Sequence, residues 1–278
     1  DQKILWDCHM HSSFSADSDT PMEKMIQTAA DKGLMGICFT EHFDPDYPDT
    51  PENLDFSLNI PAYRQKLESL ADAFKNQIQV NFGIELGLQP QLAESFSDLL
   101  KEVPFDFVIG SSHVVHGYDP YYPSYFEGRK ESACYMEYFE SILENIAAFD
   151  EMDVYGHIDY VVRYGPNQNR QYSYGRYKEI LDEILRTLIR KNVEKMNAKR
   201  KKQGLPPKKI SEHAKVNFKD LEDAQKVDEK KQAERQKKIQ DSTEYYKHAD
   251  AKPGSIAAKA RMVQQFDEKN PKGKKNKN

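Results

Sequence analysis

The stretch Met35-Gly-Ile-Cys-Phe-Thr-Glu-His42 contains the pattern that decides the fold. It begins as an apolar run, which is typical of a buried strand, and it ends in polar residues, the last of them His42. Comparable runs, each closely followed by a His or Glu, occur five times before residue 160, and a helical segment separates each run from the next. Strands that alternate with helices predict a parallel sheet or barrel built from βα units.

The predicted strands are short and regularly separated. They span Ile4–Trp6, Met35–Phe39, Ile78–Phe82, Phe105–Ile109 and Val154–Tyr155. The predicted helices between them run over 20–33, 59–75, 90–102 and 132–149, and a last helix begins near Ser173 and passes through Ile189. The carboxyl ends of the strands form the face that carries the chemistry of α/β barrels. We therefore expect the polar residues that follow the strands to lie together.

The charge of the chain changes at residue 189. Up to Ile189, 14 Lys and Arg stand against 32 Asp and Glu, a net charge of −18; from Arg190 to Asn278, 26 stand against 13, a net charge of +13. The second segment is almost free of Val, Ile, Leu and Phe, so it has little apolar surface with which to build a core. We expect one domain over residues 1–189 and a basic segment of unknown role, helical or disordered, over residues 190–278.

Several classes of protein are excluded by composition. No run of about 18 apolar residues is present, so no membrane-spanning helix is expected. The N-terminus lacks the apolar core of a signal peptide. The three cysteines, Cys8, Cys38 and Cys134, are far apart and form no C-x-x-C pair, which argues against a disulfide scaffold or a zinc ribbon. The expected location is the reducing cytoplasm.

Histidine and carboxylate residues form the strongest chemical signal. His9 and His11 are an H-x-H pair, and residues i and i+2 of an extended strand face the same side, so both imidazoles can bind one metal ion. The carboxylate of Glu85 could bridge two cations, whereas we interpret Glu41 as a solvated loop acid. Taken singly, each candidate is about as compatible with a structural role as with metal binding. The further histidine candidates follow the other strands: His42, His113 and His157.

Five motifs together resemble those of the polymerase and histidinol phosphatase (PHP) superfamily, and more specifically its bacterial histidinol-phosphatase branch. The resemblance covers about residues 3–189. The motifs are Asp7-Cys-His-Met-His-Ser-Ser-Phe-Ser-Ala-Asp-Ser18, Phe39-Thr-Glu-His42, Gly83-Ile-Glu-Leu-Gly87, Ile109-Gly-Ser-Ser-His113 and Tyr155-Gly-His-Ile-Asp159.

The resemblance implies an α/β fold, a distorted (β/α)7 barrel with a cluster of up to three divalent ions (Zn, Mn or Fe). The implied ligands are His9, His11 and Glu85 for a first ion, Glu85, His113 and His157 for a second, and His42 with Asp17 for a third. The implied activity is metal-dependent hydrolysis of a phosphate monoester, histidinol phosphate, in histidine biosynthesis.

Residues that act on the substrate are harder to assign. Arg129 and Arg163 are candidates for holding the phosphate, although each is equally compatible with a surface ion pair. His116 is a candidate proton donor to the leaving oxygen, or simply a solvent-exposed histidine. Tyr121 and Tyr122 could line a pocket, but we favour a tyrosine-rich loop that packs on itself.

The chain departs from the family pattern in its last third. The family's barrel continues for two more strands, and the last carries an Asp-x-His motif that completes two of the metal sites. Nothing after Ile189 matches that motif, so we expect a barrel that lacks its last strands and a weak or partial metal content. The activity is therefore in doubt at this stage.

Two alternative functions stay open. The first is a PHP phosphoesterase that acts on another substrate, such as a nucleic-acid end, although the acidic charge of residues 1–189 favours a small substrate. The second is an inactive, truncated or fused barrel whose basic tail binds nucleic acid. The sequence gives no oligomeric state.

Overall fold

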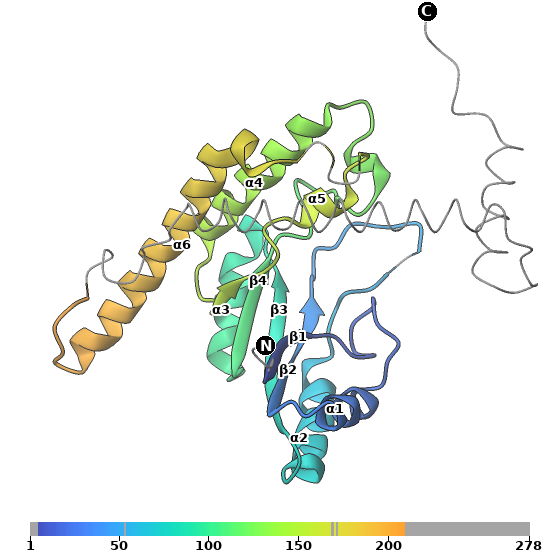
Figure 1. Cartoon of the computed structure of the whole chain (residues 1–278), viewed down its shortest axis with the longest axis vertical. Helices are drawn as coiled ribbons and strands as arrows, with labels where there is room; N and C mark the ends of the chain where they lie inside the picture. The colour runs from blue at the N-terminus through green and yellow to red at the C-terminus, as the bar shows by residue number, and fades with distance from the viewer. Residues whose placement is uncertain (1–4, 53, 168–169, 171, 209–278) are drawn as a thin grey trace, which may run out of the picture. The chain divides into compact units, whose positions relative to one another are not determined.

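The computed structural model describes residues 5–52, 54–167, 170 and 172–208 (Figure 1). The chain divides into two units, residues 1–213 and 214–278, and all of the described residues belong to the first. The part of the predicted basic segment beyond residue 208 lies outside the described residues. Its predicted character therefore stays a prediction.

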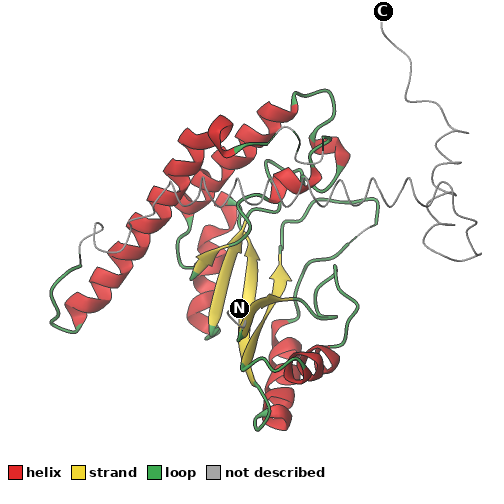
Figure 2. Cartoon of the chain, viewed as in Figure 1, coloured by secondary structure: helices red, strands yellow, loops and turns green. Residues whose placement is uncertain are grey.

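Five parallel strands form one sheet whose spatial order follows the chain order, and helices connect the strands (Figure 2). The strands are β1 (Trp6–Met10), β2 (Gly36–Phe43), β3 (Gln79–Gly87), β4 (Phe107–Ser111) and β5 (Val154–Tyr155). The helices are α1 (Met22–Asp31), α2 (Ile60–Phe74), α3 (Ala93–Glu102), α4 (Glu131–Ala148), α5 (Tyr160–Tyr164) and α6 (Tyr174–Lys202), with short 3-10 turns at Pro90–Leu92 and Pro123–Tyr125. The predicted α/β class and the alternation of strands and helices are confirmed.

The sheet is strongly curled. Neighbouring strands lie about 4.8 Å apart, so the outer strands of a flat five-stranded sheet would be separated by about 19 Å. Yet the ring centroids of His9, on β1, and His157, just after β5, are only 5.7 Å apart. The described residues therefore form a half-barrel whose concave face carries the polar residues. This agrees with the predicted barrel that lacks its last strands.

The convex face of the sheet packs against the helices to form the core. Ile37 and Phe39 of β2 are fully buried there, together with Ile26 of α1 and Tyr63 of α2. The Tyr63 hydroxyl donates hydrogen bonds to the backbone carbonyls of Phe39 and Gly83, each at 3.0 Å. Because these carbonyls belong to β2 and β3, one α2 side chain fixes the spacing of two strands whose ends carry the polar residues.

The first four strands extend further at their carboxyl ends than the apolar runs predict, and β2 and β3 show what this means for the site. β2 continues to Phe43 and β3 to Gly87, and their ladder pairs His42 with Glu85. The backbone ladder does not depend on side-chain polarity, so it continues while polar side chains face the concave side. The residues predicted to follow these strands therefore belong to the strands themselves, which gives their side chains rigid backbone anchors.

The change of charge at residue 189 falls inside a helix. α6 has a kink at Tyr177 and then continues to Lys202, lies beside α4 (Figure 1), and buries Leu181, Ile184 and Val193. It ends where Gly204 adopts a φ of 68°, the left-handed conformation that commonly terminates helices. No helix among the described residues is both long and apolar enough to cross a lipid bilayer. A domain boundary at 189 remains a prediction.

Candidate metal centre

The carboxylate of Glu85 lies at the centre of the concave face, completely buried. Its Oε2 atom lies 3.1 Å from His9 Nε2 and 3.0 Å from His11 Nε2, both carried by or just after β1. Its Oε1 atom lies 3.0 Å from His157 Nε2 and 3.3 Å from His113 Nε2, which follow β5 and β4. The curl of the sheet thus brings four imidazoles to one carboxylate.

The charge of Glu85 is stabilised by these neighbours. Burial alone would raise its pKa, because a buried carboxylate loses its hydration. The charge of His113 and the close contacts of the His11, His113 and His157 rings outweigh burial and hold the pKa well below its usual value. The Ser111 hydroxyl donates a further hydrogen bond of 2.7 Å. Glu85 is therefore an anion at neutral pH.

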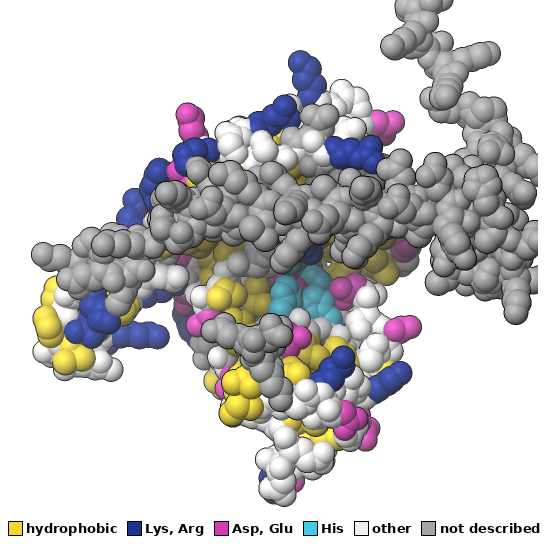
Figure 3. All heavy atoms as spheres, viewed as in Figure 1, with side chains coloured by type: hydrophobic (Ala, Val, Ile, Leu, Met, Phe, Trp, Pro, Cys, Tyr) yellow, Lys and Arg dark blue, Asp and Glu magenta, His cyan; other side chains and the backbone are white. Residues whose placement is uncertain are grey.

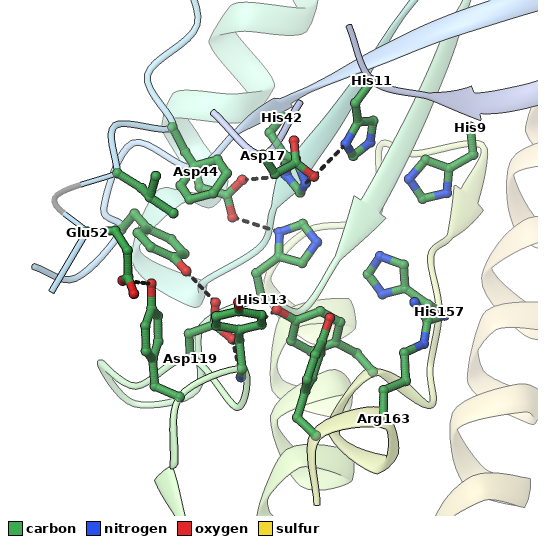
Figure 4. Close-up of a pocket in the computed structure, with 17 residues that line it drawn as sticks. His9, His11, Asp17, His42, Asp44, Glu52, His113, Asp119, His157 and Arg163 are labelled. Carbon is green, nitrogen blue, oxygen red and sulfur yellow. Dashed lines mark hydrogen bonds and ion pairs between the residues drawn. The ribbon is translucent and has the colours of Figure 1, made fainter. Parts of the chain in front are cut away.

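Two aspartates extend the cluster on the β2 side (Figure 4). Asp17 Oδ2 lies 3.2 Å from His11 Nδ1 and 3.5 Å from His42 Nε2. Asp44 contacts two rings: Oδ1 lies 2.7 Å from His113 Nδ1 and Oδ2 lies 3.2 Å from His42 Nδ1. Such carboxylate contacts orient imidazoles, and they fix which ring nitrogen faces a bound metal ion.

The absence of a side chain at Gly87 leaves the space that Asp44 occupies. A Cβ atom at Gly87, at the end of β3, would lie only 1.8 Å from Asp44 Oδ1. Any side chain at position 87 would displace that carboxylate and with it the orientation of the His113 ring. This gives a physical reason for the second glycine of the Gly83–Gly87 motif.

Glu41 is a buried structural acid, so its interpretation as a solvated loop acid was wrong. Its carboxylate is completely buried and accepts hydrogen bonds from the backbone N–H and the hydroxyl of Ser12 and from the hydroxyl of Ser15. The Ser15 hydroxyl accepts in turn from the backbone N–H of His42, at 2.9 Å. Glu41 thereby ties the loop that carries His11 and Asp17 to the end of β2.

The donor set fits divalent metal ions. His11 Nε2 and His113 Nε2 are buried beside Glu85, yet neither makes a hydrogen bond of acceptable geometry, and His157 Nδ1 is buried without a partner. Buried polar atoms are normally satisfied, so unsatisfied imidazole nitrogens aimed at a carboxylate are a ligand arrangement. Within the described residues, donor atoms within 4.8 Å of one another form three groups: His9 with Glu85 and His157, His11 with His42 and Glu85, and His42 with Asp44 and His113.

This grouping differs in part from the ligand sets that the family resemblance implies. All seven predicted ligands lie in or beside the cluster, since Asp17 contacts both His11 and His42. His157, however, shares a group with His9 rather than with His113, and Asp44 was missed. Asp44 lies two residues after His42, and the same i, i+2 argument that links His9 and His11 could have found it.

A cavity of about 680 Å³ opens beside the cluster, and Figure 3 shows histidine and acidic side chains together on the same surface. Asp119, which was not predicted, is buried in its wall and accepts hydrogen bonds from the hydroxyls of Tyr47 and Tyr160 and from the backbone N–H of Tyr121. Burial raises the pKa of Asp119, although these hydrogen bonds act in the opposite direction. The wall is acidic and aromatic.

Of the three residues predicted to act on the substrate, one lines the cavity and two do not. Arg163, on α5, lines the cavity with a side chain that is 51% exposed, and its nearest acidic partner is Asp159 at 3.5 Å. Arg129 instead forms an ion pair with Glu137 at 2.6 Å and does not line the cavity. His116, with a side chain 57% exposed, contacts Glu137 and Glu144, also outside the cavity. The structure gives Arg129 and His116 no place in the site.

The tyrosine-rich loop also differs from the interpretation that we favoured. Tyr121 and Tyr122 contact each other, with ring centroids 5.0 Å apart, but both line the cavity. Tyr121 also contacts Tyr164 of α5 across the opening, at 5.1 Å. The loop therefore both packs on itself and forms one wall.

Comparison with known proteins identifies related chains. A family model described as the PHP domain matches residues 7–194. A histidinol-phosphatase of Lactococcus lactis subsp. lactis is 38% identical over 187 residues, which cover 66% of this chain and 68% of that protein.

Two solved structures share the fold. The crystal structure of histidinol phosphate phosphatase from the same organism, complexed with zinc, L-histidinol and phosphate, is 36% identical, with a TM-score of 0.63, covering 67% of this chain and 70% of that chain. A structure from Listeria monocytogenes, 17% identical and covering 66% and 77% of the two chains, superposes with a TM-score of 0.53.

Proposed function

Since the chain belongs to the PHP domain family, we propose that it is a histidinol-phosphatase, a metal-dependent hydrolase of phosphate monoesters. The observation that carries this proposal is the ring of four imidazoles around the buried Glu85 carboxylate, which opens on a cavity large enough for a small ligand. A relative with 36% identity binds zinc, L-histidinol and phosphate. These facts all support the metal-dependent hydrolysis of a phosphate monoester.

We assign the metal ions to the seven predicted ligands together with Asp44. When bound, divalent ions of the zinc type neutralise the charge of a phosphate ester and lower the pKa of water. The protein residues would hold these ions beside the cavity, and the contacts of Asp44 and Asp17 with the imidazoles would keep the rings in place. The possible use of manganese or iron in place of zinc, and the number of bound ions, are also part of this proposal. The ligands are His9, His11, Asp17, His42, Asp44, Glu85, His113 and His157.

Arg163 binds the phosphate in this proposal. Among the described residues that line the cavity it is the only Lys or Arg, and a guanidinium pairs with phosphate oxygens through two parallel hydrogen bonds. Its exposed side chain can turn from Asp159 toward the cavity. Arg163 therefore supplies the cationic contact that an otherwise acidic wall lacks.

The acidic wall suits the other end of the substrate. Histidinol phosphate carries an ammonium group and an imidazole as well as its phosphate. Asp119 and Glu52 line the cavity on the side of the tyrosines, where they can pair with a cation. A nucleic-acid end would instead bring further phosphates against these acids, so the cavity favours a small zwitterionic substrate over a nucleic acid. The predicted cytoplasmic location follows from this biosynthetic role and belongs to the proposal.

The test is phosphate release from L-histidinol phosphate by the purified full chain supplied with Zn²⁺ or Mn²⁺. We expect release that Glu85→Gln abolishes, because this variant removes the charge that holds the imidazoles together. The matched control is His116→Ala, which changes an exposed histidine outside the cavity and should leave the rate unchanged. Absence of release from a folded, metal-supplied sample would contradict the proposal.

A further inference from the structure

Two cysteines lie side by side on the concave face, below the metal centre. The parallel register pairs Trp6 with Gly36 and Asp7 with Ile37 and, after an irregularity in β1, Met10 with Phe39, so Cys8 and His9 together lie opposite Cys38. A Cβ at Gly36 would collide with the Trp6 ring, which shows that these two positions share one face. Because side chains alternate along the regular strand β2, Cys38 shares that face, and Cys8 lies opposite it at the irregularity of β1.

Independent observations place both thiols there. Cys8 lines the hollow between the outer strands β1 and β5, together with Trp6 and Val154. A Cβ at Gly83, on β3, would lie 2.7 Å from Cys38 Sγ, so the Cys38 thiol also points to the concave side. Cys8 is moreover one of the groups whose charge acts on Cys38.

The strand geometry suits a covalent link. Neighbouring strands lie about 4.7–4.9 Å apart, and disulfides bridge Cα atoms separated by about 4.4–6.8 Å. Cys38 Sγ leans toward β3 and contacts the Phe39 carbonyl at 3.6 Å. The link requires Cys38 to rotate about χ1 to another staggered position, which turns Sγ toward β1.

We propose that Cys8 and Cys38 form a reversible disulfide across the β1–β2 pair when the protein meets a hydroperoxide. The two thiols have different roles. Cys8 is exposed and reacts with the oxidant, whereas Cys38 is buried and serves as the resolving thiol. Burial raises the pKa of Cys38 to about 12, so this thiol is not the one that reacts first.

The reaction is a two-electron oxidation in two steps. Cys8 sulfur attacks the peroxide, the O–O bond breaks, and Cys8 becomes a sulfenic acid while the other oxygen leaves as water. Cys38 sulfur then attacks Cys8 sulfur, the S–O bond breaks, and the released hydroxide takes the Cys38 proton to form a second water. Two thiols are oxidised to one disulfide, and a thiol reductant reverses the change.

The link has a consequence for the edge of the sheet. β1 pairs with β2 on one side only, and its residues are largely exposed. A disulfide at Cys8 ties this edge strand to its neighbour one residue before His9. The oxidised protein should therefore show slower hydrogen exchange at the β1 amides.

The test is non-reducing peptide mapping by mass spectrometry after treatment of the full chain with hydrogen peroxide. We expect one cross-linked species that joins the Cys8 and Cys38 peptides, is lighter by two hydrogens than the two peptides together, and disappears with dithiothreitol. Cys134→Ser is the matched control, because Cys134 lies buried in α4 and its loss should leave the link unchanged.

Several outcomes would overturn the proposal. One is oxidation of Cys8 to a sulfinic acid with Cys38 left free. Another is a Cys8–Cys8 link between two chains. A third is a Cys8–Cys38 link without any slowing of hydrogen exchange over Trp6–Met10. The wild-type chain decides the first two by itself, so the result does not depend on whether Cys8→Ser or Cys38→Ser folds.

Discussion

Protons and metal ions compete for the same imidazole nitrogens at the centre of the half-barrel. Burial acts to lower the pKa of His11, but its contacts with the carboxylates of Asp17 and Glu85 outweigh this and raise the pKa to about 9. Burial is likewise outweighed at His42, by Asp17 and Asp44, and at His113, by the charges of Asp44 and Glu85, so both pKa values are raised. His11 is therefore protonated at neutral pH, and the raised pKa values favour the charged forms of His42 and His113, whereas metal ligation requires the neutral form.

We therefore predict that zinc binding at pH 7 releases protons and that zinc affinity increases as the pH rises toward about 9. The sign follows from the raised pKa values: below about pH 9, His11 must lose a proton before it can ligate, and each loss costs affinity. Calorimetric titrations with Zn²⁺ in buffers of different ionisation enthalpy measure the released protons. The His116→Ala variant should release the same number, and a pH-independent affinity would contradict the prediction.

Arg163 gives a second prediction at this scale. Arg163→Ala should lower kcat/KM for histidinol phosphate by about 10- to 100-fold, since a charge-assisted hydrogen bond contributes about 1.5–3 kcal/mol. Arg129→Ala is the matched control, because that guanidinium pairs with Glu137 away from the cavity. Steady-state kinetics measure both variants. Equal losses in the two would show that overall charge, rather than a phosphate contact, explains the effect.

At the scale of elements, the order of the βα units could be predicted from sequence because apolar runs and helical segments alternate so regularly. The residues at which the strands end could not be predicted in this way. The apolar pattern stops at Phe39 and Phe82, whereas the ladder continues to Phe43 and Gly87, since backbone hydrogen bonds do not depend on side-chain type. A polar residue on the concave face of a half-barrel breaks the hydrophobic pattern without ending the strand.

The site residues that could not be predicted from sequence also depend on contacts that a local pattern does not show. The predicted histidine ligands and Glu85 each closely follow a predicted strand, so local sequence marked them as candidates, and the family resemblance supplied Asp17 and the ligand sets. Asp119 lies in the loop after β4, and its part in the cavity depends on Tyr47 and Tyr160, which are 72 and 41 residues away in sequence. Glu41 acts through contacts with the loop after β1, which no local pattern encodes.

The loop between β1 and α1 provides a prediction about an element. In Glu41→Gln, one carboxylate oxygen becomes an NH₂ group that faces the N–H and O–H donors of Ser12 and Ser15. Unpairing buried polar groups costs about 1–3 kcal/mol each, so we expect the free energy of unfolding to decrease by about that amount. The loop that carries Asp17 should also exchange its amide hydrogens faster.

Chemical denaturation and hydrogen exchange measure the two effects. Glu94→Gln, at an exposed position in the first turn of α3, is the matched control for the loss of a negative charge. If the two variants unfold at the same denaturant concentration, the Glu41 network does not stabilise the fold.

For the whole molecule, the decisive feature is that the concave face stays open in the described residues. β1 and β5 are outer strands, and Trp6, Val154 and Leu5 are exposed large apolar residues at the open side. His9, with a side chain that is 38% exposed, is the least buried of the imidazoles around Glu85. The matched region covers 68% of the Lactococcus lactis relative. The donor group that contains His9 is therefore the most accessible to water.

We predict from this arrangement that the chain retains fewer than three zinc ions after extensive dialysis. The groups around His11 and His113 each include buried donors, and they should hold zinc more tightly than the group of His9. The acidic charge of residues 1–189 attracts cations, but it does not supply a coordinating atom. Elemental analysis of the dialysed protein by mass spectrometry measures the ratio of zinc to chain.

The variants of the cluster make this prediction specific. His9→Ala should leave the retained zinc almost unchanged, because the weakest group is already empty after dialysis, whereas His113→Ala should lower it. Glu85→Gln should lower it most, since Glu85 belongs to two of the three donor groups. Three zinc ions retained by the unmodified chain would show instead that exposure of His9 does not limit metal binding and that the open half-barrel is a complete metal centre.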